Sequence, residues 1–347
     1  MNFEIIDNKK HCKKIFIKNS ITDNFEKKEL TSTWSYDPYL KDCEIEYGSI
    51  YAQGKTITDC CPKENLDHWN HLVSKHFAFQ KSFKLGKVSL EDTCFYDLVP
   101  ENFTLDFFNL KSKINEYVIQ NFERPKNYDF LLDLSDLVYS IQHSKLNINL
   151  SSLAERSVDE KTKNTFLKFN STSPFIHYNI FGSVTGRLTT FKHSFPILNL
   201  NKQNRDILYP TNDLFVELDY NAAEFRSLLA LAGIEQPNED IHDFHLRKLK
   251  QVMVDEFTRE QVKTRMFKWL YGGNVSLGIS ALEEIYNKDK ILNKYWDGEK
   301  ITNPYGREIE CDSYHALSYL NQSFLSDLFL RKVIEIHKFL ENRKSFV

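Results

Sequence analysis

The stretch that decides the interpretation of this sequence is REQVKTRMFKWLYGG, residues 259–273. Four of its side chains recur at every fourth position: Arg259, Lys263, Phe267 and Tyr271. Positions four apart lie on one face of an α-helix, so this spacing predicts a helix with two cations and then two aromatic rings along one side. Thr258 and Gln261 fit a capping box at the start of the helix, and the two glycines fit its end.

This face suits a nucleoside triphosphate. The two cations can hold a polyphosphate tail, and the two rings can lie against a base. A surface helix, with solvated cations and with aromatic rings that reach the core, fits the same residues equally well. The pattern alone leaves both interpretations open.

A second pattern lies upstream. The apolar run Leu214–Leu218 predicts a short buried strand, which leads directly into Asp219 and Tyr220. Asn221 and Glu224 have the spacing of a capping box, and the apolar residues that follow keep a helical period as far as a terminal glycine. A carboxylate between a strand and a helix is a frequent Mg²⁺ ligand, although a lone aspartate there is more often structural.

Six segments of the chain resemble, in order, the motifs of the family A DNA polymerases, the group of bacterial DNA polymerase I and several phage replicases. The segments are Thr185-Gly186-Arg187-Leu188; Asp219-Tyr220 with Glu224 and Arg226; Asp240-Ile241-His242; Arg259, Lys263, Phe267, Tyr271 and Gly272; Tyr305-Gly306-Arg307; and Gln322-Ser323 with Asp327. They extend over about 145 of the 347 residues. No single match is decisive, but their shared order makes chance agreement a poor explanation.

The resemblance implies an α+β, right-hand polymerase fold with a helical thumb, a palm built on an antiparallel sheet, and helical fingers. We expect residues 1–170 to form an N-terminal region that includes the thumb, because apolar residues recur at helical spacing from 105 to 170. Residues 171–347 are then the palm and fingers, with the fingers at about 221–310. A long amphipathic pattern over 313–343 predicts a helix that returns to the palm.

The activity implied is that of a DNA-directed DNA polymerase, a nucleotidyltransferase that joins dNMP to a primer 3′-hydroxyl. Such enzymes use two Mg²⁺ ions, one to activate the hydroxyl and one to hold the triphosphate. The resemblance makes Asp219 the ligand that bridges both ions, helped by the backbone carbonyl of Tyr220. It makes Arg259 and Lys263 the catalytic cations that neutralise the β- and γ-phosphates.

The resemblance also assigns residues to the bound dNTP. Phe267 is expected to pack on its base and sugar, and His242 to lie near its triphosphate. Glu224 is expected below the sugar, where it leaves no room for a 2′-hydroxyl. Tyr271 is expected to hold the position of the template base.

Contacts with primer-template DNA follow from the same motifs. Arg187 and Gln322 are expected to reach minor-groove acceptors common to all base pairs, and Arg226 to belong to the DNA-binding set. Ser318 stands where the family has an Asn, four residues before Gln322. We therefore expect fewer minor-groove contacts than in the large members.

The greatest departure concerns motif C, which supplies the second metal-binding carboxylate. Counted from Gln322, that motif is expected near position 355, beyond Val347. Asp327 and Glu341 lie in the predicted long helix and are poor substitutes. We therefore expect a C-terminally truncated chain with an incomplete palm, inactive as this fragment alone, unless a separate C-terminal polypeptide supplies motif C.

An editing exonuclease needs a cluster of carboxylates, commonly opened by Asp-x-Glu at the end of a strand. Asp42 and Glu44 have this spacing, but Pro38 and the residues after it form a poor strand. The chain before Thr185 is also too short to hold both an exonuclease and a thumb. We expect no exonuclease.

Composition sets broader bounds. The net charge is −3, so positive charge is local: between His245 and Lys268 seven Lys or Arg residues stand against three acids. The six cysteines form no C-x-x-C pair, and no signal peptide or long apolar run is present. We expect reduced thiols, no membrane partner, and a place in the cytoplasm of a bacterium or of a phage-infected cell.

Two functions of different class therefore stand side by side. The first is a phage-like DNA polymerase of replication or repair, active when its palm is completed. The second is a non-catalytic remnant that binds DNA or nucleotides. Single-subunit RNA polymerases have a similar helix to the one predicted at 259–273. Glu224 and the Thr-Gly-Arg segment, however, fit that class of enzyme poorly.

Overall fold

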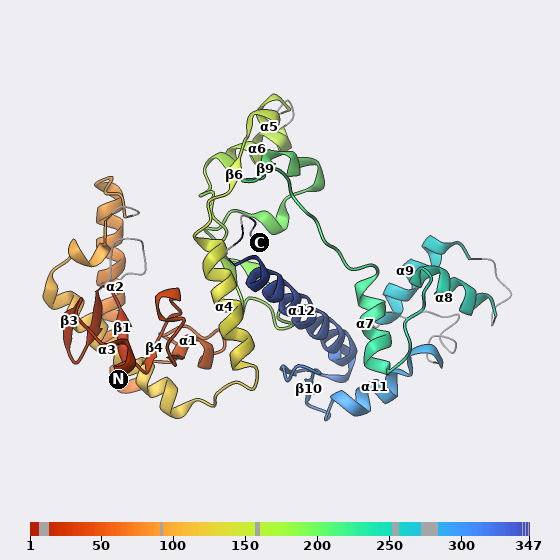
Figure 1. Cartoon of the computed structure of the whole chain (residues 1–347), viewed down its shortest axis with the longest axis horizontal. Coiled ribbons are helices and arrows are strands. Elements are labelled where there is room, and N and C mark those ends of the chain that lie inside the picture. The colour runs from red at the N-terminus through yellow and green to blue at the C-terminus, as the bar shows by residue number, and fades with distance from the viewer. Residues whose placement is uncertain are drawn as a thin grey trace. The chain divides into compact units, whose positions relative to one another are not determined.

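A computed structural model describes the chain except at residues 7–13, 91–92, 157–159, 252–256, 272–283, 342, 344 and 346. The chain divides into two compact units, Met1–His143 and Ser144–Val347. Figure 1 shows mixed helix and strand in both, so the expected α+β class is confirmed at this level. Among the described helices, none is both long and apolar enough to cross a lipid bilayer.

The first unit combines short strands with three long helices. Its strands are β1 (Phe3–Ile5), β2 (Ile15–Ile17), β3 (Ser20–Thr22), β4 (Ser32–Thr33) and β5 (Glu46–Tyr47). Strands β1, β2 and β3 form an antiparallel sheet in which Phe3 lies opposite Ile17, and β4 pairs with β5 in parallel. A parallel bridge from Asn2 to Ser32 joins β4 to the β1 edge.

Helices pack against these strands. They are α1 (Gly48–Tyr51), α2 (Lys63–Leu85), α3 (Glu101–Asn121) and α4 (Tyr128–Gln142), with single turns η1 (Lys27–Glu29), η2 (Pro38–Leu40) and η3 (Phe95–Asp97). Helix α3 buries Phe107, Leu110, Ile114 and Val118 at intervals of three or four, which is the spacing that predicted a helix here. Asp42 follows η2 in a turn and does not end a strand.

The second unit begins with small elements. They are β6 (Asn147–Ile148), α5 (Ser151–Glu155), α6 (Glu160–Asn170), β7 (Tyr178–Asn179), β8 (Thr189–Thr190), η4 (Ile197–Asn199), η5 (Lys202–Ile207) and β9 (Leu208–Tyr209). Strands β6 and β9 pair antiparallel, as do β7 and β8. In the part of this unit that is described, the antiparallel sheet expected of a palm is present only as two-stranded ladders.

Larger helices follow. The elements are α7 (Ala223–Ala232), α8 (Ile241–Lys250), α9 (Arg259–Leu270), α11 (Lys288–Tyr295), β10 (Lys300–Thr302), β11 (Glu308–Glu310) and α12 (Ser313–Leu340). One apolar core joins them: Phe225 and Leu228 of α7, Met266 of α9 and Leu320 of α12 are all fully buried. The amphipathic pattern that predicted a long final helix is therefore confirmed.

The predicted strand at Leu214–Leu218 is wrong. The segment runs from β9 to α7 without strand structure, and Leu214, Phe215, Val216 and Leu218 are 63–74% exposed. An apolar run indicates burial only if a neighbouring strand pairs with its backbone, and none of the described strands does so. The capping box predicted at Asn221 and Glu224 is also wrong, because the helix starts from Ala222 in a left-handed conformation with no side-chain cap.

A buried ion pair connects α12 to the loop after β10. The Asp327 carboxylate, 1% exposed, accepts hydrogen bonds from Arg307 Nη2 at 2.7 Å and from Asn303 Nδ2 at 2.8 Å. The Arg307 guanidinium also lies under Gly186, where an added Cβ would come within 2.6 Å of Arg307 Cζ. Gly186 has a φ of +78°, so both its conformation and this close approach require glycine.

We predict that Asp327→Ala lowers the free energy of unfolding by about 3–5 kcal/mol, because it leaves the Arg307 charge buried without a partner. Urea unfolding of the full chain measures this. Glu335→Ala is the matched control on the same helix, since Glu335 pairs with Lys332 at the surface and its loss should cost less than about 1 kcal/mol. Equal losses in the two variants would contradict the structural role of the Asp327–Arg307 pair.

Candidate nucleotide and nucleic-acid site

Helix α9 forms as the sequence predicted. Thr258 Oγ1 accepts a hydrogen bond from the Gln261 N–H, and the Gln261 side chain accepts one from the Thr258 N–H, which completes the capping box. The helix ends at Tyr271, while Gly272 and Gly273 lie outside the described residues. Val262, Met266, Trp269 and Leu270 turn into the core, and the predicted cations and rings lie along the flank of the helix beside this buried side.

We call that side the α9 face, which consists of Arg259, Lys263, Phe267 and Tyr271. The Phe267 and Tyr271 rings are nearly parallel, with centroids 6.5 Å apart and planes inclined by 10°. Phe267 also meets Phe225 of α7 edge to face at 4.8 Å. The aromatic half of the face is therefore fixed by packing before any ligand is present.

A cluster of polar side chains surrounds the Tyr271 hydroxyl. It donates to Glu224 Oε1 at 2.8 Å, and Arg187 Nη2 donates to the same oxygen at 3.4 Å. Burial, and then Glu224, raise the pKa of Tyr271, while a hydrogen bond with Gln322 and the charge of Arg187 oppose that rise. The structure thus brings together Glu224, Tyr271, Arg187 and Gln322, which come from four distant parts of the sequence. We call them the Glu224 cluster.

Two members of the Glu224 cluster, Arg187 and Glu224, are positioned by contacts that the sequence alone did not define. Arg187 follows Gly186, which is packed on the Arg307 guanidinium, within the β7–β8 connection. Helix α7 is fixed to α12 by Asn321, whose Nδ2 donates to the Glu224 carbonyl at 2.9 Å and whose Oδ1 accepts from Ser227 at 2.7 Å. Sequence reasoning missed Asn321, because only its place beside Gln322 could have drawn attention to it.

The cationic half of the α9 face is partly engaged. Arg259 Nη2 donates to both carboxylate oxygens of Asp240, at 3.0 and 3.1 Å. Asp240 also caps α8, accepting from the N–H groups of His242 and Asp243. Lys263 forms no hydrogen bond or ion pair with a described residue, so its ammonium group is the cation of this face that is available to an anion.

His242 lies close to these cations. It is buried, and its Nδ1 has no hydrogen-bond partner among the described residues. Burial lowers its pKa; the charges of Arg259 and Lys263 lower it further, against the opposing effect of Asp240. A neutral imidazole beside two cations can accept or donate a hydrogen bond without adding charge to the site.

Other predicted residues lie apart from these contacts. Asp219 and Tyr220 are exposed, in the coil that leads to α7, and Asp219 forms no hydrogen bond or ion pair in the described structure. Arg226 donates to the carbonyls of Pro237 and Glu239, both at 3.2 Å. Its guanidinium therefore holds the loop before α8, and it forms no hydrogen bond with the Glu224 cluster among the described residues.

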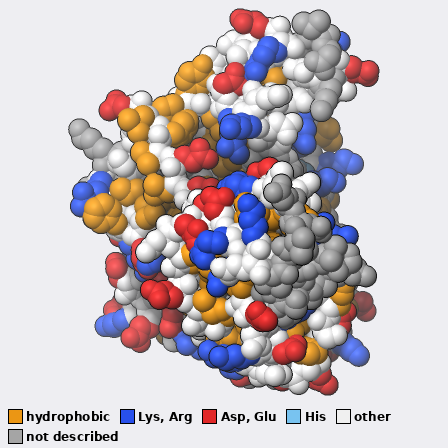
Figure 2. Space-filling model, turned by 90° about the vertical axis from the view of Figure 1, so that its right-hand side faces the viewer, with side chains coloured by type: hydrophobic (Ala, Val, Ile, Leu, Met, Phe, Trp, Pro, Cys, Tyr) orange, Lys and Arg blue, Asp and Glu red, His pale blue; other side chains and the backbone are white. Residues whose placement is uncertain are grey.

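The surface that bears α8 and α9 carries charges of both signs. Figure 2 shows basic and acidic side chains interspersed across this side of the molecule. Arg247 pairs with Glu239, and Arg259 with Asp240. The excess of Lys and Arg in the sequence of this region is thus partly neutralised by carboxylates from the neighbouring loop.

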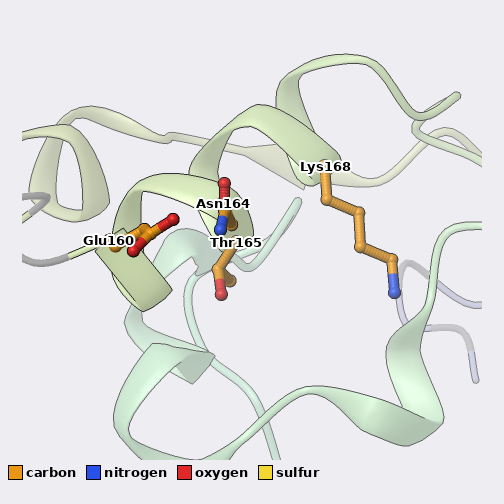
Figure 3. Close-up of a pocket in the computed structure, with 4 residues that line it drawn as sticks. All are labelled: Glu160, Asn164, Thr165 and Lys168. Atoms are coloured by element: carbon orange, nitrogen blue, oxygen red, sulfur yellow. The ribbon is translucent and has the colours of Figure 1, made fainter.

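A separate hollow of about 580 Å³ lies along α6 and is lined by Glu160, Asn164, Thr165 and Lys168 (Figure 3). All four residues come from one helix, so the hollow has a single described wall. None of the predicted site residues lines it. We assign it no part in the nucleotide site.

The chain is similar to the POL domain of Pol1 from M. smegmatis, solved as a complex with DNA primer-template and dNTP. The likeness covers 90% of this chain and 76% of that domain, with a TM-score of 0.56 and 12% sequence identity. No protein-family model matches, and no curated protein does.

We predict a pH-dependent loss of stability in Asp240→Asn, which keeps the cap of α8 but removes the charge. Burial raises the pKa of Asp240, but Arg259 and the two helix N–H groups outweigh burial and hold the pKa below its ordinary value. A lowered folded-state pKa stabilises the ionised form above pH ~3.9, and this stabilisation disappears as the pH falls through the folded-state pKa.

The variant should therefore lose up to about 1 kcal/mol of unfolding free energy at pH 7 and less than that at pH 3. The loss is small because solvent screens the Asp240–Arg259 pair. Urea unfolding at the two pH values measures the difference. Asp243→Asn is the control, since Asp243 lies 3.6 Å from Arg259 Nε and is half exposed. The same loss at both pH values would show that the Asp240 charge does not stabilise the fold.

A TM-score of 0.56 at 12% identity shows the fold alone. The α9 face and the Glu224 cluster both lie in the second unit of this fold. The chain therefore has the fold of a DNA polymerase domain.

Proposed function

We propose that this chain is a DNA polymerase of the family A type, which binds primer-template DNA and a dNTP at the α9 face. The observation that carries the proposal is the Glu224 cluster. Two residues that the motifs assign to the dNTP, Glu224 and Tyr271, meet two that they assign to primer-template DNA, Arg187 and Gln322, around the Tyr271 hydroxyl. The solved neighbour, described as a complex with primer-template and dNTP, supports the same class of ligand.

In this proposal the dNTP lies along α9. Its triphosphate meets Lys263 first, because that ammonium group has no described counter-ion, and Arg259 joins when the phosphates compete with Asp240. The base and sugar lie against Phe267, whose ring is already fixed by Phe225. His242 contributes a neutral hydrogen-bonding group near the phosphates.

Glu224 and Tyr271 form the sugar side of the site. Their hydrogen bond holds the Glu224 carboxylate beside the aromatic half of the α9 face. A 2′-hydroxyl on the sugar would meet this carboxylate, whose Oε1 already accepts hydrogen bonds from Tyr271 and Arg187. Deoxynucleotides would be selected by this lack of room. Arg187 and Gln322 remain close enough to reach the minor groove of the primer-template, as the motifs predict.

Magnesium fits this site in part. Asp219 is an exposed carboxylate without a described partner, and Mg²⁺ is commonly held by one or two carboxylates together with substrate phosphates and water. When bound, the ion would supply charge stabilisation for phosphoryl transfer, with the Tyr220 carbonyl as a further oxygen ligand. Asp327 is unsuitable as a second ligand, because it is buried and occupied by Arg307 and Asn303.

The second metal ion therefore needs a carboxylate from outside the described residues. The exposed segment Leu214–Leu218 supports this view, since four of its five residues are apolar, as in strands that a neighbouring layer covers. We propose that added strands, in a segment or polypeptide that carries motif C, pair with it and complete the palm. Without them the alternative function applies, that of a DNA- or nucleotide-binding protein with no catalysis.

We predict that Lys263→Ala weakens Mg²⁺-dependent dATP binding roughly 10- to 100-fold, the effect of losing one charge-assisted hydrogen bond. Affinity for primer-template DNA should change less than threefold. Isothermal titration measures the first and fluorescence anisotropy of labelled DNA the second.

Lys268→Ala is the matched control, because Lys268 lies on α9 but is exposed on another side of the helix. It should leave both affinities unchanged. The assignment of Lys263 would be refuted by equal losses of dATP and DNA affinity, or by equal effects of the two variants.

A further inference from the structure

Helix α7 carries Glu224 in its first turn, and no side-chain cap holds the start of that helix. Ala222, the residue before the helix, has a φ of +48°, which costs conformational energy in a residue with a side chain. Helix ends without a cap tend to fray. A carboxylate in such a turn keeps one position only if contacts from elsewhere in the fold restrain the turn.

Asn321 of α12 supplies this restraint together with Ser227 of α7. The Asn321 Nδ2 donates to the Glu224 carbonyl at 2.9 Å, and its Oδ1 accepts from Ser227 Oγ at 2.7 Å. Ser227 Oγ also lies 2.9 Å from the Glu224 carbonyl, so the three groups form one network around the backbone of the first turn. Asn321 is 1% exposed and Ser227 is 5% exposed, so water does not compete for these hydrogen bonds.

The surroundings of this network are apolar. Leu228 of α7 and Leu317 and Leu320 of α12 are buried in the same core. Apolar contacts are non-directional, so they bring the two helices together without fixing where the Glu224 backbone lies. Hydrogen bonds are directional, and a buried network whose members are paired specifies one arrangement. Asn321 therefore contributes the position of the first turn rather than net stability.

The next residue of α12 restrains the partner of Glu224. Gln322 forms a hydrogen bond with the Tyr271 side chain, whose hydroxyl donates to Glu224 Oε1 at 2.8 Å. Tyr314, at the start of α12, donates to the Tyr271 backbone carbonyl at 3.4 Å. Helix α12 thus restrains the backbone that carries Glu224 and, separately, the ring that binds its carboxylate.

We propose that Asn321, with Ser227, is a positioning residue for Glu224 and thereby sets the preference of the site for deoxynucleotides over ribonucleotides. This role rests on the proposed function, in which the 2′ side of the sugar meets the Glu224 carboxylate. Asn321 is buried and touches no nucleotide. It keeps the carboxylate where a 2′-hydroxyl would lie. Once the first turn of α7 is free to shift, the carboxylate can move aside and the ribose fits.

The pair dATP and ATP tests this directly, because the two nucleotides differ only in the 2′-hydroxyl. We expect the full chain to bind dATP roughly tenfold more tightly than ATP in isothermal titration with Mg²⁺. Asn321→Leu keeps the branched outline of the side chain but removes both hydrogen bonds. It should reduce the preference to less than about threefold, through tighter binding of ATP, and should leave the dATP affinity within about threefold.

A double-mutant cycle separates positioning from a general loss of structure. In Glu224→Ala, which has no carboxylate to position, adding Asn321→Leu should leave the ratio of the two affinities unchanged. A merely structural Asn321 would instead lower the affinity for both nucleotides in either background. Ser326→Ala is the matched control and should keep the preference, since it removes a buried hydroxyl of α12 that bonds to no described residue of α7.

Ser227→Ala keeps the test decisive if Asn321→Leu does not fold. It removes a single hydroxyl, leaves Asn321 Oδ1 without its partner, and should lower the preference by about threefold. A preference that survives in Asn321→Leu, or in Ser227→Ala if only that variant folds, would overturn the role of Asn321 and leave the dNTP site standing. Equal binding of dATP and ATP by the unchanged chain would do the same. Binding of neither nucleotide would overturn the proposed function and the role of Asn321 with it.

Discussion

The architecture of the candidate site depends on the ion pair between Asp327 and Arg307. The Asp327 carboxylate is buried, the Arg307 side chain is 13% exposed and Asn303 completes the pair, so the loop after β10 is fixed against α12. The Arg307 guanidinium then forms the surface on which Gly186 rests, and Arg187 follows directly. A buried pair of this kind contributes little net stability compared with apolar packing, but it holds two segments in one relative position.

From that anchor the contacts run outward to the Glu224 cluster. Arg187 reaches Glu224 on α7, and Glu224 accepts from Tyr271 at the end of α9. Helix α7 is itself fixed to α12 by Asn321. Glu224 is therefore held by Arg187 on one side and, through α7, by Asn321 on the other. The aromatic end of the α9 face adjoins this cluster. At the cationic end, Asp240 holds Arg259.

Local patterns predicted local structure well. The capping box of α9, the glycine that ends α7 and the long apolar period of α12 are all present, because each depends on residues within one or two helical turns. The motifs also named the members of the Glu224 cluster. The motifs could not predict how these residues are held together. The hydrogen bonds of Asp327 with Arg307 and of Asn321 with Glu224 join residues far apart in the sequence, and no local pattern indicates such pairs.

The failures have the same cause. The run Leu214–Leu218 has the composition of a buried strand, but composition does not supply a neighbouring strand. The start of α7 depends on a left-handed Ala222, a conformation that no local signal indicated.

The α9 face is proposed to bind one nucleoside triphosphate. The most direct measurement is a crystal structure of the full chain with dATP, Mg²⁺ and primer-template DNA. We expect phosphate oxygens within hydrogen-bonding distance of Lys263 and Arg259, with the sugar between Phe267 and Glu224. A triphosphate bound away from α9, with no phosphate at Lys263, would contradict this site.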